Sequence, residues 1–263
     1  MRVSARFPAA LVLAVIASLV WGAFGGSNRA NTNAAFETFA SLPASPRPAL
    51  EIRALEPLGS DRFLSRWTTV RAATAARLQP AMDAAAVARV PRETPEGTPN
   101  ALPVLRTRGN STGQVWVKVR LSSLPNGKVG WVPRQALGGY ETVNTHLIVD
   151  RAHLKASLLR RGRVIFSAPV GIGTAAWPTP AGEFIVRNEL TRYASPFYGP
   201  VAFGTTARSV LTDWPGGGFI GIHGTDEPQL IPGRVSHGCI RMRNRDIVRL
   251  TSLMPVGTPL TIQ

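Results

Sequence analysis

The sequence predicts a mainly β protein with two β-rich units, the second of which contains one short helix. Several short runs alternate apolar and polar residues, as residues 115–120 do, and this is the period of a half-buried strand. Turn signals separate the runs, among them Asn126-Gly127, a pair that tolerates the positive φ angles of a tight hairpin. Helical spacing of apolar residues occurs late, at positions 247, 250 and 253. Because the connections are short, we expect a small barrel followed by a β-sandwich or meander.

The first 30 residues are predicted to form a signal peptide or a membrane anchor. Arg2 and Arg6 precede an uncharged stretch over residues 7–28, and a positive segment before an apolar run is typical of secretory signals. The stretch also approaches the roughly 20 residues that a membrane-spanning helix needs. Residues 23–25, Ala-Phe-Gly, offer a small-x-small cleavage site, so cleavage and retention both stay open. We expect an extracytoplasmic protein of the cell wall or periplasm, either membrane-anchored or secreted.

Residues 31–60 are predicted to be a flexible linker. Residues 41–48 read Ser-Leu-Pro-Ala-Ser-Pro-Arg-Pro, and few large apolar residues surround them. The remaining chain is long enough for one large or two small domains. We divide it into residues 61–139 and residues 140–263.

The first of these units contains four predicted strands and one candidate helix. The strands are expected at residues 67–70, 103–105, 114–120 and 129–132. The turn signal Pro125-Asn126-Gly127-Lys128 lies between the last two. Residues 81–90 are rich in alanine, which predicts a brief helix.

Residues 61–139 resemble the bacterial SH3-like domains, small β-barrels that often accompany cell-wall enzymes. The likeness rests on residues 115–119, on the Asn-Gly turn and on residues 130–132, Gly-Trp-Val. Trp116 and Trp131 would either pack in the core of such a barrel or stack on a ligand, and core packing is the simpler interpretation.

The second unit, residues 140–263, is predicted from further strand patterns and the late helix. Strands are expected at residues 145–150, 154–159, 164–166, 168–173, 182–186 and 260–262. A turn at residues 160–162 joins two of them. The helix is expected over residues 244–253, with Asn244 as its N-cap.

The chain is strongly basic, with 30 Lys and Arg against 15 Asp and Glu and a formal charge of +15. Such a charge suits a polyanionic partner. The basic residues are scattered rather than gathered into one stripe, which argues against nucleic acid. Outside a bacterial cell the partners would be anionic wall polymers, and the N-terminal segment would contact the membrane.

Cys239 is the single cysteine of the chain and therefore has no partner for a disulfide within it. An unpaired cysteine in an exported protein is a candidate reactive thiol, although a lone cysteine is often a small buried hydrophobic residue. A thiol needs a base to become a good nucleophile at neutral pH. His223 lies sixteen positions before Cys239 and His237 two before it. The remaining histidines, 146 and 153, lack such neighbours and are predicted to be a strand residue and a surface residue.

The residues around Cys239 predict further parts of an active site. Gly238 lets the backbone turn sharply, so the amides of His237, Gly238 and Cys239 can converge on a developing oxyanion. Arg241 would hold a substrate carboxylate through two hydrogen bonds, or would form a surface salt bridge instead.

Residues 145–263 closely resemble the catalytic domain of the bacterial L,D-transpeptidases. Three motifs carry the resemblance in the family's order. They are residues 178–184, Pro-Thr-Pro-Ala-Gly-Glu-Phe, then residues 223–225, His-Gly-Thr, and then residues 236–241, Ser-His-Gly-Cys-Ile-Arg. Nothing in these motifs departs from the family pattern.

The resemblance implies a role for each matching residue. Cys239 would be the nucleophile, His223 the general base, and the carbonyl of Gly224 would orient that base. His237 would contribute through its backbone and by shaping the pocket, although sequence proximity alone would favour it as the base. Substrate contacts are expected from Arg241, Ser236, Thr225, Tyr193 and Tyr198.

The two tyrosines belong to an aromatic segment, residues 193–200, at the position of the family's substrate lid. A lid would exclude water from the site. A plain loop, or packing in the core, is the alternative.

The resemblance also implies a reaction on peptidoglycan stem peptides. Cys239 would attack the carbonyl before the terminal D-Ala of a tetrapeptide stem, and an amine of a second stem would resolve the thioester into a 3→3 crosslink. Water as acceptor would make the enzyme an L,D-carboxypeptidase. A zinc site made of His223, His237 and Cys239 is a further alternative, although the spacing lacks a zinc motif and a fourth ligand. A wall-binding protein without catalysis is the last. We expect no metal and no other cofactor.

Overall fold

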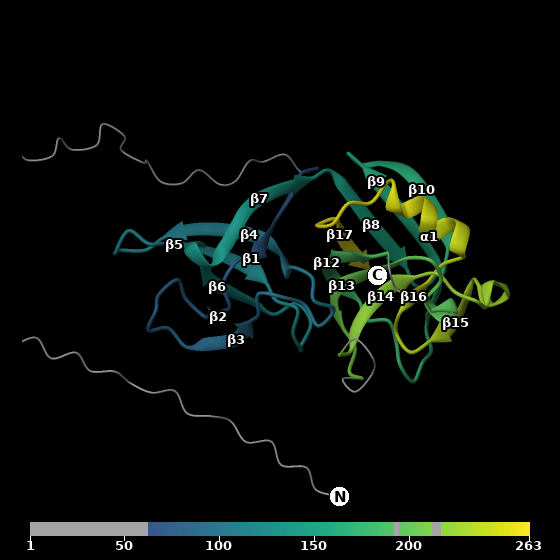
Figure 1. The fold of residues 1–263 in the computed structure, drawn as a ribbon, viewed down its shortest axis with the longest axis horizontal. Coiled ribbons are helices and arrows are strands. Elements are labelled where there is room, and N and C mark those ends of the chain that lie inside the picture. Colours follow the sequence, from purple (N-terminus) through teal and green to yellow (C-terminus); the bar gives the residue numbers. More distant parts are fainter. Residues whose placement is uncertain (1–62, 192–194, 212–216) are drawn as a thin grey trace, which may run out of the picture. The chain divides into compact units, whose positions relative to one another are not determined.

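The computed structural model describes residues 63–191, 195–211 and 217–263 (Figure 1). The predicted signal peptide or anchor, residues 1–30, and the predicted linker, residues 31–60, lie outside the described residues. No helix within the described part has the length and apolar character needed to cross a membrane. All of the described residues belong to one compact unit, Glu51–Gln263.

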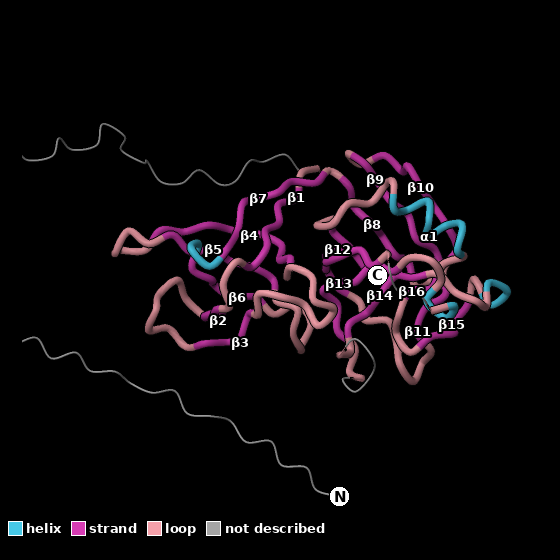
Figure 2. Tube along the Cα trace, in the orientation of Figure 1, coloured by secondary structure: helices cyan, strands magenta, loops and turns pink. Residues whose placement is uncertain are grey.

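The prediction of a mainly β protein is confirmed, because strands dominate the described residues (Figure 2). They fall into two sheets. The strands of the first sheet are β1 (Ser65–Val70), β2 (Thr74–Arg77), β3 (Ala86–Val90), β4 (Ala101–Gly109), β5 (Val115–Arg120), β6 (Val129–Pro133) and β7 (Leu137–Val143). A 3₁₀ turn, η1 (Arg134–Ala136), precedes β7.

The first sheet has the strand order β3-β2-β6-β5-β4-β1-β7 and its own hydrophobic core. Each inner strand pairs antiparallel with its neighbours. Trp116 and Trp131 are both buried, so the prediction that they pack in the core is confirmed. The likeness of this unit to an SH3-like barrel stays a prediction.

The alanine-rich residues 81–90 do not form the brief helix that their composition predicts. Residues 86–90 are instead strand β3, which pairs with β2 from Thr74↔Val90 to Arg77↔Ala86. Helix propensity is a weak local preference that tertiary pairing overrides. In this segment the hydrogen bonds to a neighbouring strand decide the structure.

The second sheet has ten strands in the order β10-β9-β8-β17-β12-β13-β14-β16-β11-β15. They are β8 (Thr145–Asp150), β9 (Lys155–Arg160), β10 (Arg163–Pro169), β11 (Gly171–Gly173), β12 (Gly182–Leu190), β13 (Ala202–Arg208), β14 (Phe219–His223), β15 (Gly233–Ser236), β16 (Ile240–Arg241) and β17 (Pro259–Ile262). The 3₁₀ turns η2 (Pro196–Tyr198) and η3 (Pro228–Leu230) interrupt the later connections.

Meander topology holds within two groups of strands but not for the whole sheet. β8, β9 and β10 follow one another, as do β12, β13 and β14. The last strand, β17, lies between the groups, where it pairs parallel with β8 and antiparallel with β12. One core cluster draws apolar residues from both groups and from the helix.

The predicted late helix is present as α1 (Asn244–Thr251), with Ile247 and Leu250 buried (Figure 1). Its N-cap residue is Arg243, and no side chain caps it. The expected capping role of Asn244 is therefore wrong. Its side-chain oxygen instead accepts a hydrogen bond from the amide of Thr225 at 2.9 Å, because the loop after β14 packs against the start of the helix.

The neighbouring parallel strands β14 and β16 bring two distant motifs together. Ile222 lies opposite Ile240, and His223 opposite Arg241. Gly221 and Cys239 immediately precede these paired positions. The sheet thus places the His-Gly motif beside the cysteine motif.

Candidate active site

Cys239 lies in the short turn between β15 and β16, and the turn is held by Ser236. The Ser236 hydroxyl donates to the carbonyl oxygen of Cys239 at 2.6 Å and accepts from the amide of Gly238 at 3.1 Å. Gly238 has φ +118°, a conformation that side chains rarely tolerate, and a Cβ there would meet Ile220. The motif therefore needs glycine and serine at these positions to present the thiol.

Thr179, from the Thr-Pro segment, supports the same turn from the other side. Its hydroxyl donates to the carbonyl oxygen of Gly238 at 2.7 Å and accepts from the amide of Gly173 at 2.9 Å. The threonine is 1% exposed. The segment that the sequence marks only by resemblance thus has a physical task, which is to join β11 to the cysteine turn.

His223, at the end of β14, is buried with one ring nitrogen fixed. Its Nδ1 lies 2.6 Å from the carbonyl oxygen of Gly224. Since a carbonyl only accepts hydrogen bonds, Nδ1 carries the proton and Nε2 is left unprotonated. The Tyr198 ring meets the imidazole edge-on, with centroids 4.8 Å apart, and restrains its orientation.

Gly221 shows how closely the thiol and the imidazole approach. A Cβ placed on this glycine would lie 3.8 Å from the Cys239 sulfur and 3.8 Å from Cδ2 of His223. Cδ2 is bonded to Nε2, so the unprotonated side of the ring borders the same small space as the sulfur. The Gly221 amide also donates to the sulfur at 3.3 Å.

Burial shifts both titrating groups toward their neutral forms. Burial lowers the pKa of His223 to about 4, with the Gly224 carbonyl acting against the shift and Arg241 adding to it. Burial raises the pKa of the Cys239 thiol, against the opposing effects of the Gly221 amide and Arg241. At neutral pH the resting site therefore holds a thiol and a neutral imidazole, not an ion pair.

Arg241 forms the salt bridge that the sequence left as an alternative, but the arginine is buried beside the pocket rather than at the surface. Its side chain is 6% exposed and contacts Glu227 at 3.0 Å. Its guanidinium also lies 4.6 Å from the centre of the Phe197 ring. The Nε atom has no hydrogen-bond partner among the described residues, so the group retains donor capacity.

The described part of the predicted lid borders the pocket. Phe197 and Tyr198 lie in η2 and line the cavity that holds the thiol. Gly199 packs so closely on Gly224 that a Cβ on either would clash with the other's backbone. Tyr193, also expected to contact substrate, lies outside the described residues.

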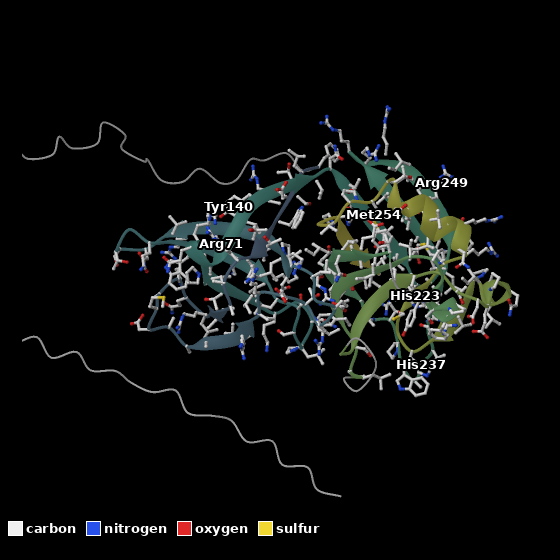
Figure 3. All side chains as sticks on the ribbon, viewed as in Figure 1. Arg71, Tyr140, His223, His237, Arg249 and Met254 are labelled. Carbon is white, nitrogen blue, oxygen red and sulfur yellow. The ribbon has the colours of Figure 1, made fainter. Side chains whose placement is uncertain are left out.

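The two histidines of the motifs occupy different environments (Figure 3). His223 is inside the fold near β14, whereas His237 is at its edge and half-buried. The His237 ring lies against Trp177, with centroids 4.4 Å apart. As predicted, His146 is a strand residue and His153 is a surface residue.

The structure brings most of the predicted residues to one cavity. It is lined by Phe197, Tyr198, Ser209, Leu211, Gly218, Phe219, Ile220, His223, Ser236, His237, Cys239 and Arg241. Thr225 is not among them, so its predicted contact with substrate is not supported. Its hydroxyl accepts from the amide of Glu227 at 3.0 Å, and the side chain is buried in the loop after β14.

Sequence reasoning missed Phe219, which lines this cavity, and also Glu227 and Trp177, which contact the lining residues Arg241 and His237. Each acts through a contact with a distant segment, and no local motif marks it. Among the described residues, no group of three or more His, Cys, Asp and Glu side chains is arranged to hold a metal ion.

The family model for the L,D-transpeptidase catalytic domain, YkuD type, matches residues 144–262. YkuD of Bacillus subtilis, named for this activity, is 34% identical over 121 residues, covering 46% of this chain and 67% of that protein. YbiS of Escherichia coli K12 is 29% identical over 137 residues, and the match covers 45% of this chain and 44% of that protein. The chain therefore belongs to the L,D-transpeptidase family.

Solved structures of the family also match this chain. The catalytic domain of the Enterococcus faecium L,D-transpeptidase is 24% identical, with a TM-score of 0.36, and the match covers 45% of this chain and 96% of that one. An L,D-transpeptidase from Mycobacterium smegmatis is 14% identical with a TM-score of 0.37, and the match covers 59% of this chain and 79% of that one.

Proposed function

We propose that the protein is a peptidoglycan L,D-transpeptidase that forms 3→3 crosslinks through a Cys239 thioester. The observation that carries the proposal is the fixed tautomer of His223. Its Nδ1 proton is bound by the Gly224 carbonyl, and its basic edge borders the same space as the thiol. A buried, oriented base next to a partly exposed thiol is the arrangement that acyl transfer requires.

The first half-reaction transfers the acyl group of a donor stem to the enzyme. The thiol proton moves to Nε2 of His223 as the sulfur attacks the carbonyl carbon before the terminal D-Ala. The carbon–nitrogen bond then breaks, and His223 returns the proton to the leaving amine. Because the thiol is neutral at rest, His223 removes its proton during the attack rather than beforehand.

The second half-reaction releases the acyl group to an amine of a neighbouring stem. The amine attacks the thioester carbonyl and gives up a proton to His223, while the sulfur leaves and is reprotonated. Phe197 and Tyr198 line the site and would limit entry of water, which favours the amine over hydrolysis.

The oxyanion of each tetrahedral intermediate would be bound by backbone amides of the cysteine turn. The Gly238 amide already donates to Ser236, so the proposal places this task on Cys239 with support from His237. Arg241 would bind a substrate carboxylate, in competition with Glu227. Ser236 acts on the turn and not primarily on substrate.

The proposal is tested with a disaccharide-tetrapeptide as donor and acceptor, and with mass spectrometry of the products. The unmodified chain should release D-Ala and form a crosslinked dimer. Cys239→Ala should reduce release by at least about 10⁴-fold, without lowering the thermal midpoint. Arg163→Gln, which changes an exposed arginine of β10, is the matched control and should be fully active.

Each other outcome selects an alternative. Trimmed monomer without dimer would indicate an L,D-carboxypeptidase. Wall binding by Cys239→Ala, together with no D-Ala release by either chain, would indicate a wall-binding protein. Activity that EDTA removes and iodoacetamide spares would indicate the zinc site.

A further inference from the structure

A second cavity, which we call the Arg208 pocket, lies outside the catalytic pocket. Its volume is about 260 Å³, against about 20 Å³ for the catalytic pocket. Pockets for drug-sized ligands usually have about 300–1,000 Å³, so this one has room for a small molecule. It is lined by Ala88, Arg89, Val90, Pro91, Glu93, Thr94, Pro95, Asn100, Leu102, Leu121, Ser122, Ser123, Arg187, Arg208 and Phe219.

The charged groups at this pocket leave two arginines, Arg89 and Arg208, without an ion-pair partner among the described residues. The guanidinium groups are those of Arg89, Arg187 and Arg208, and the carboxylates are those of Glu93 and Glu96. Glu96 binds Arg187 through both of its oxygens, at 2.9 and 2.7 Å. Arg208 has no ion-pair partner among the described residues, and burial lowers its pKa. Glu93 pairs with Arg92 at 3.9 Å and Glu96 pairs with Arg187, so the remaining excess of positive charge favours an anionic ligand.

Four polar atoms of the lining residues are buried and without a hydrogen-bond partner in the described part of the chain. They are Nε of Arg187, Nε of Arg208 and the hydroxyl oxygens of Ser122 and Ser123. The Arg187 side chain is 1% exposed. Buried polar atoms are nearly always hydrogen-bonded in folded proteins. Since all four can donate, the missing partner is an acceptor such as an oxyanion.

The walls of the pocket are held in place before any ligand arrives. Asn126 joins the segment with the two serines to Arg208, because its amide donates to the Arg208 carbonyl at 2.8 Å and accepts from the Arg208 amide at 2.9 Å. Asn126 therefore does more than form the turn between β5 and β6. It anchors the β5–β6 connection to the strand that carries Arg208.

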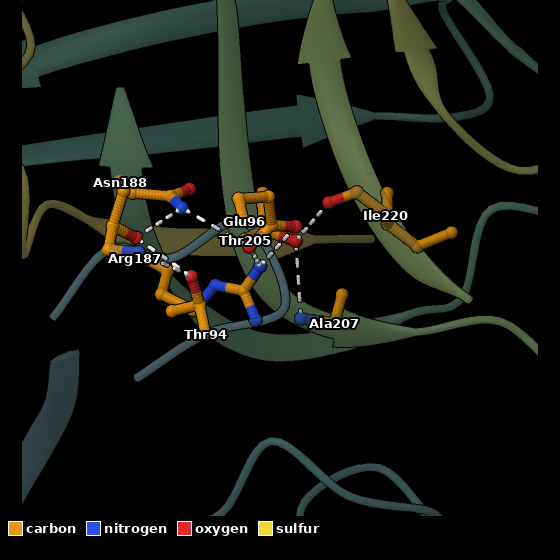
Figure 4. A network of polar contacts seen from close by, with 8 residues as sticks. Thr94, Glu96, Arg187, Asn188, Thr205, Ala207 and Ile220 are labelled. Atoms are coloured by element: carbon orange, nitrogen blue, oxygen red, sulfur yellow. Dashed lines mark hydrogen bonds and ion pairs between the residues drawn. The ribbon is translucent and has the colours of Figure 1, made fainter. Parts of the chain in front are cut away.

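Residues 94–98, two of which line the pocket, are anchored to β12 (Figure 4). Next to the Arg187–Glu96 pair, Asn188 donates to the hydroxyl of Thr98 at 2.7 Å. Thr98 in turn hydrogen-bonds the Thr94 hydroxyl at 2.8 Å. Residues 94–98 are thereby fixed beside the pocket, which reduces the ordering needed when a ligand binds.

Phe219 connects the Arg208 pocket with the catalytic pocket, because its side chain lines both. Its ring lies 3.8 Å from the Arg187 guanidinium and 4.3 Å from that of Arg208. Such contacts orient a guanidinium and leave its edge for planar acceptors. The second pocket is therefore a neighbour of the reaction site.

We propose that the Arg208 pocket binds a small ligand through a single carboxylate, such as the terminal residue of a peptide. Arg208 binds the carboxylate, with Nε of Arg187 and the hydroxyls of Ser122 and Ser123 as further donors. Identifying this carboxylate as the end of a second wall stem rests on the proposed function. The binding of a carboxylate itself does not.

The test uses N-acetyl-D-alanine as the probe and the full chain carrying Cys239→Ala, which prevents turnover. Titration calorimetry gives the Kd, and amide chemical shifts locate the probe. We expect shift changes at Ser122 and Ser123. Arg208→Gln should weaken binding at least about tenfold, since a charged hydrogen bond contributes about 1.5–3 kcal/mol. Arg208→Lys should retain part of the affinity, and the control Arg163→Gln should retain all of it.

Arg241→Gln separates the two pockets. It should leave the shifts at Ser122 and Ser123 unchanged, whereas shifts confined to positions 221 and 239 would overturn the proposal. Tighter binding of inorganic phosphate than of the probe would overturn the assignment to a carboxylate. If Arg208→Gln lowers the thermal midpoint, the shift changes in the chain with intact Arg208 decide whether the probe binds in the Arg208 pocket. If the unmodified chain releases no D-Ala while the probe still binds to the Cys239→Ala chain, only the proposed function is refuted.

Discussion

The catalytic pocket and the Arg208 pocket differ in how many of their polar groups are hydrogen-bonded within the chain. In the catalytic pocket the Ser236 hydroxyl holds the cysteine turn, Nδ1 of His223 is bound by Gly224, and Arg241 is paired with Glu227. Among its described lining residues only Nε of Arg241 is a buried donor without a partner, whereas the Arg208 pocket has four such donors. A site that fixes one reactive geometry uses most of its polar groups internally, and a site that binds a ligand keeps more donors available.

The largest effect that separates the two pockets is expected from His223→Gln. The amide cannot accept the thiol proton and return it, so D-Ala release should fall by about 10²–10⁴-fold. Binding of N-acetyl-D-alanine to the Arg208 pocket should be unchanged. D-Ala release by mass spectrometry and calorimetry of the probe check the two statements.

The control for this variant is His153→Gln, which changes a surface histidine. It should alter neither quantity. Equal loss of D-Ala release in His237→Gln and His223→Gln would show that the base has not been identified, and loss of probe binding in His223→Gln would show that the pockets are not independent.

Acid should destabilise the catalytic region through His223. Its folded pKa, about 4, lies below the usual 6.5, so the unfolded chain takes up the proton first as the pH falls. The stabilisation by neutral His223 is fully present above pH 6.5 and is lost as the pH falls toward 4. The loss amounts to about 3 kcal/mol of unfolding free energy.

Urea unfolding at a series of pH values measures this contribution as the difference between the unmodified chain and His223→Gln. The difference should change between pH 6.5 and 4 and be constant above that range. A difference independent of pH would mean that His223 is protonated as readily in the folded chain as in the unfolded one.

The smallest effect is expected from removing the Thr179 hydroxyl, which supports the cysteine turn of the catalytic region. Thr179→Val leaves the Gly238 carbonyl and the Gly173 amide without their partner, which should cost about 1–3 kcal/mol of unfolding free energy. Urea unfolding measures it. Thr191→Val, at an exposed position, should change stability by less than about 0.5 kcal/mol, and an equal effect of both would contradict the role of Thr179.

Local patterns in the sequence were sufficient for most strands and for the helix. The alternation at residues 115–120 and the turn at residues 160–162 correspond to β5 and to the β9–β10 hairpin, in which Arg161 and Gly162 both have positive φ. The prediction of a helix over residues 81–90 was wrong, because alanine content indicates only a local preference and the pairing of β3 with β2 is a tertiary contact.

The candidate site shows the same division. The lone cysteine, its glycine and the two histidines can be selected from the sequence as reactive candidates, and the family resemblance favours His223. Position in the chain alone would favour His237, which lies only two residues before Cys239. The structure distinguishes the two histidines by their surroundings. The His223 ring is buried with Nδ1 bound by a carbonyl, whereas the His237 ring lies against Trp177.

The sequence by itself determined the mainly β class, the motifs around Cys239 and the membership of the family, because these depend on residue types and short spacings. Only the tertiary structure decided that β17 joins two strand groups, that Thr179 supports a turn 59 positions away, and that Asn126 holds Arg208 across 82 positions. The physical reason is that hydrogen bonds and burial act through space. Residues far apart in the chain carry no local signal of the partner that folding gives them.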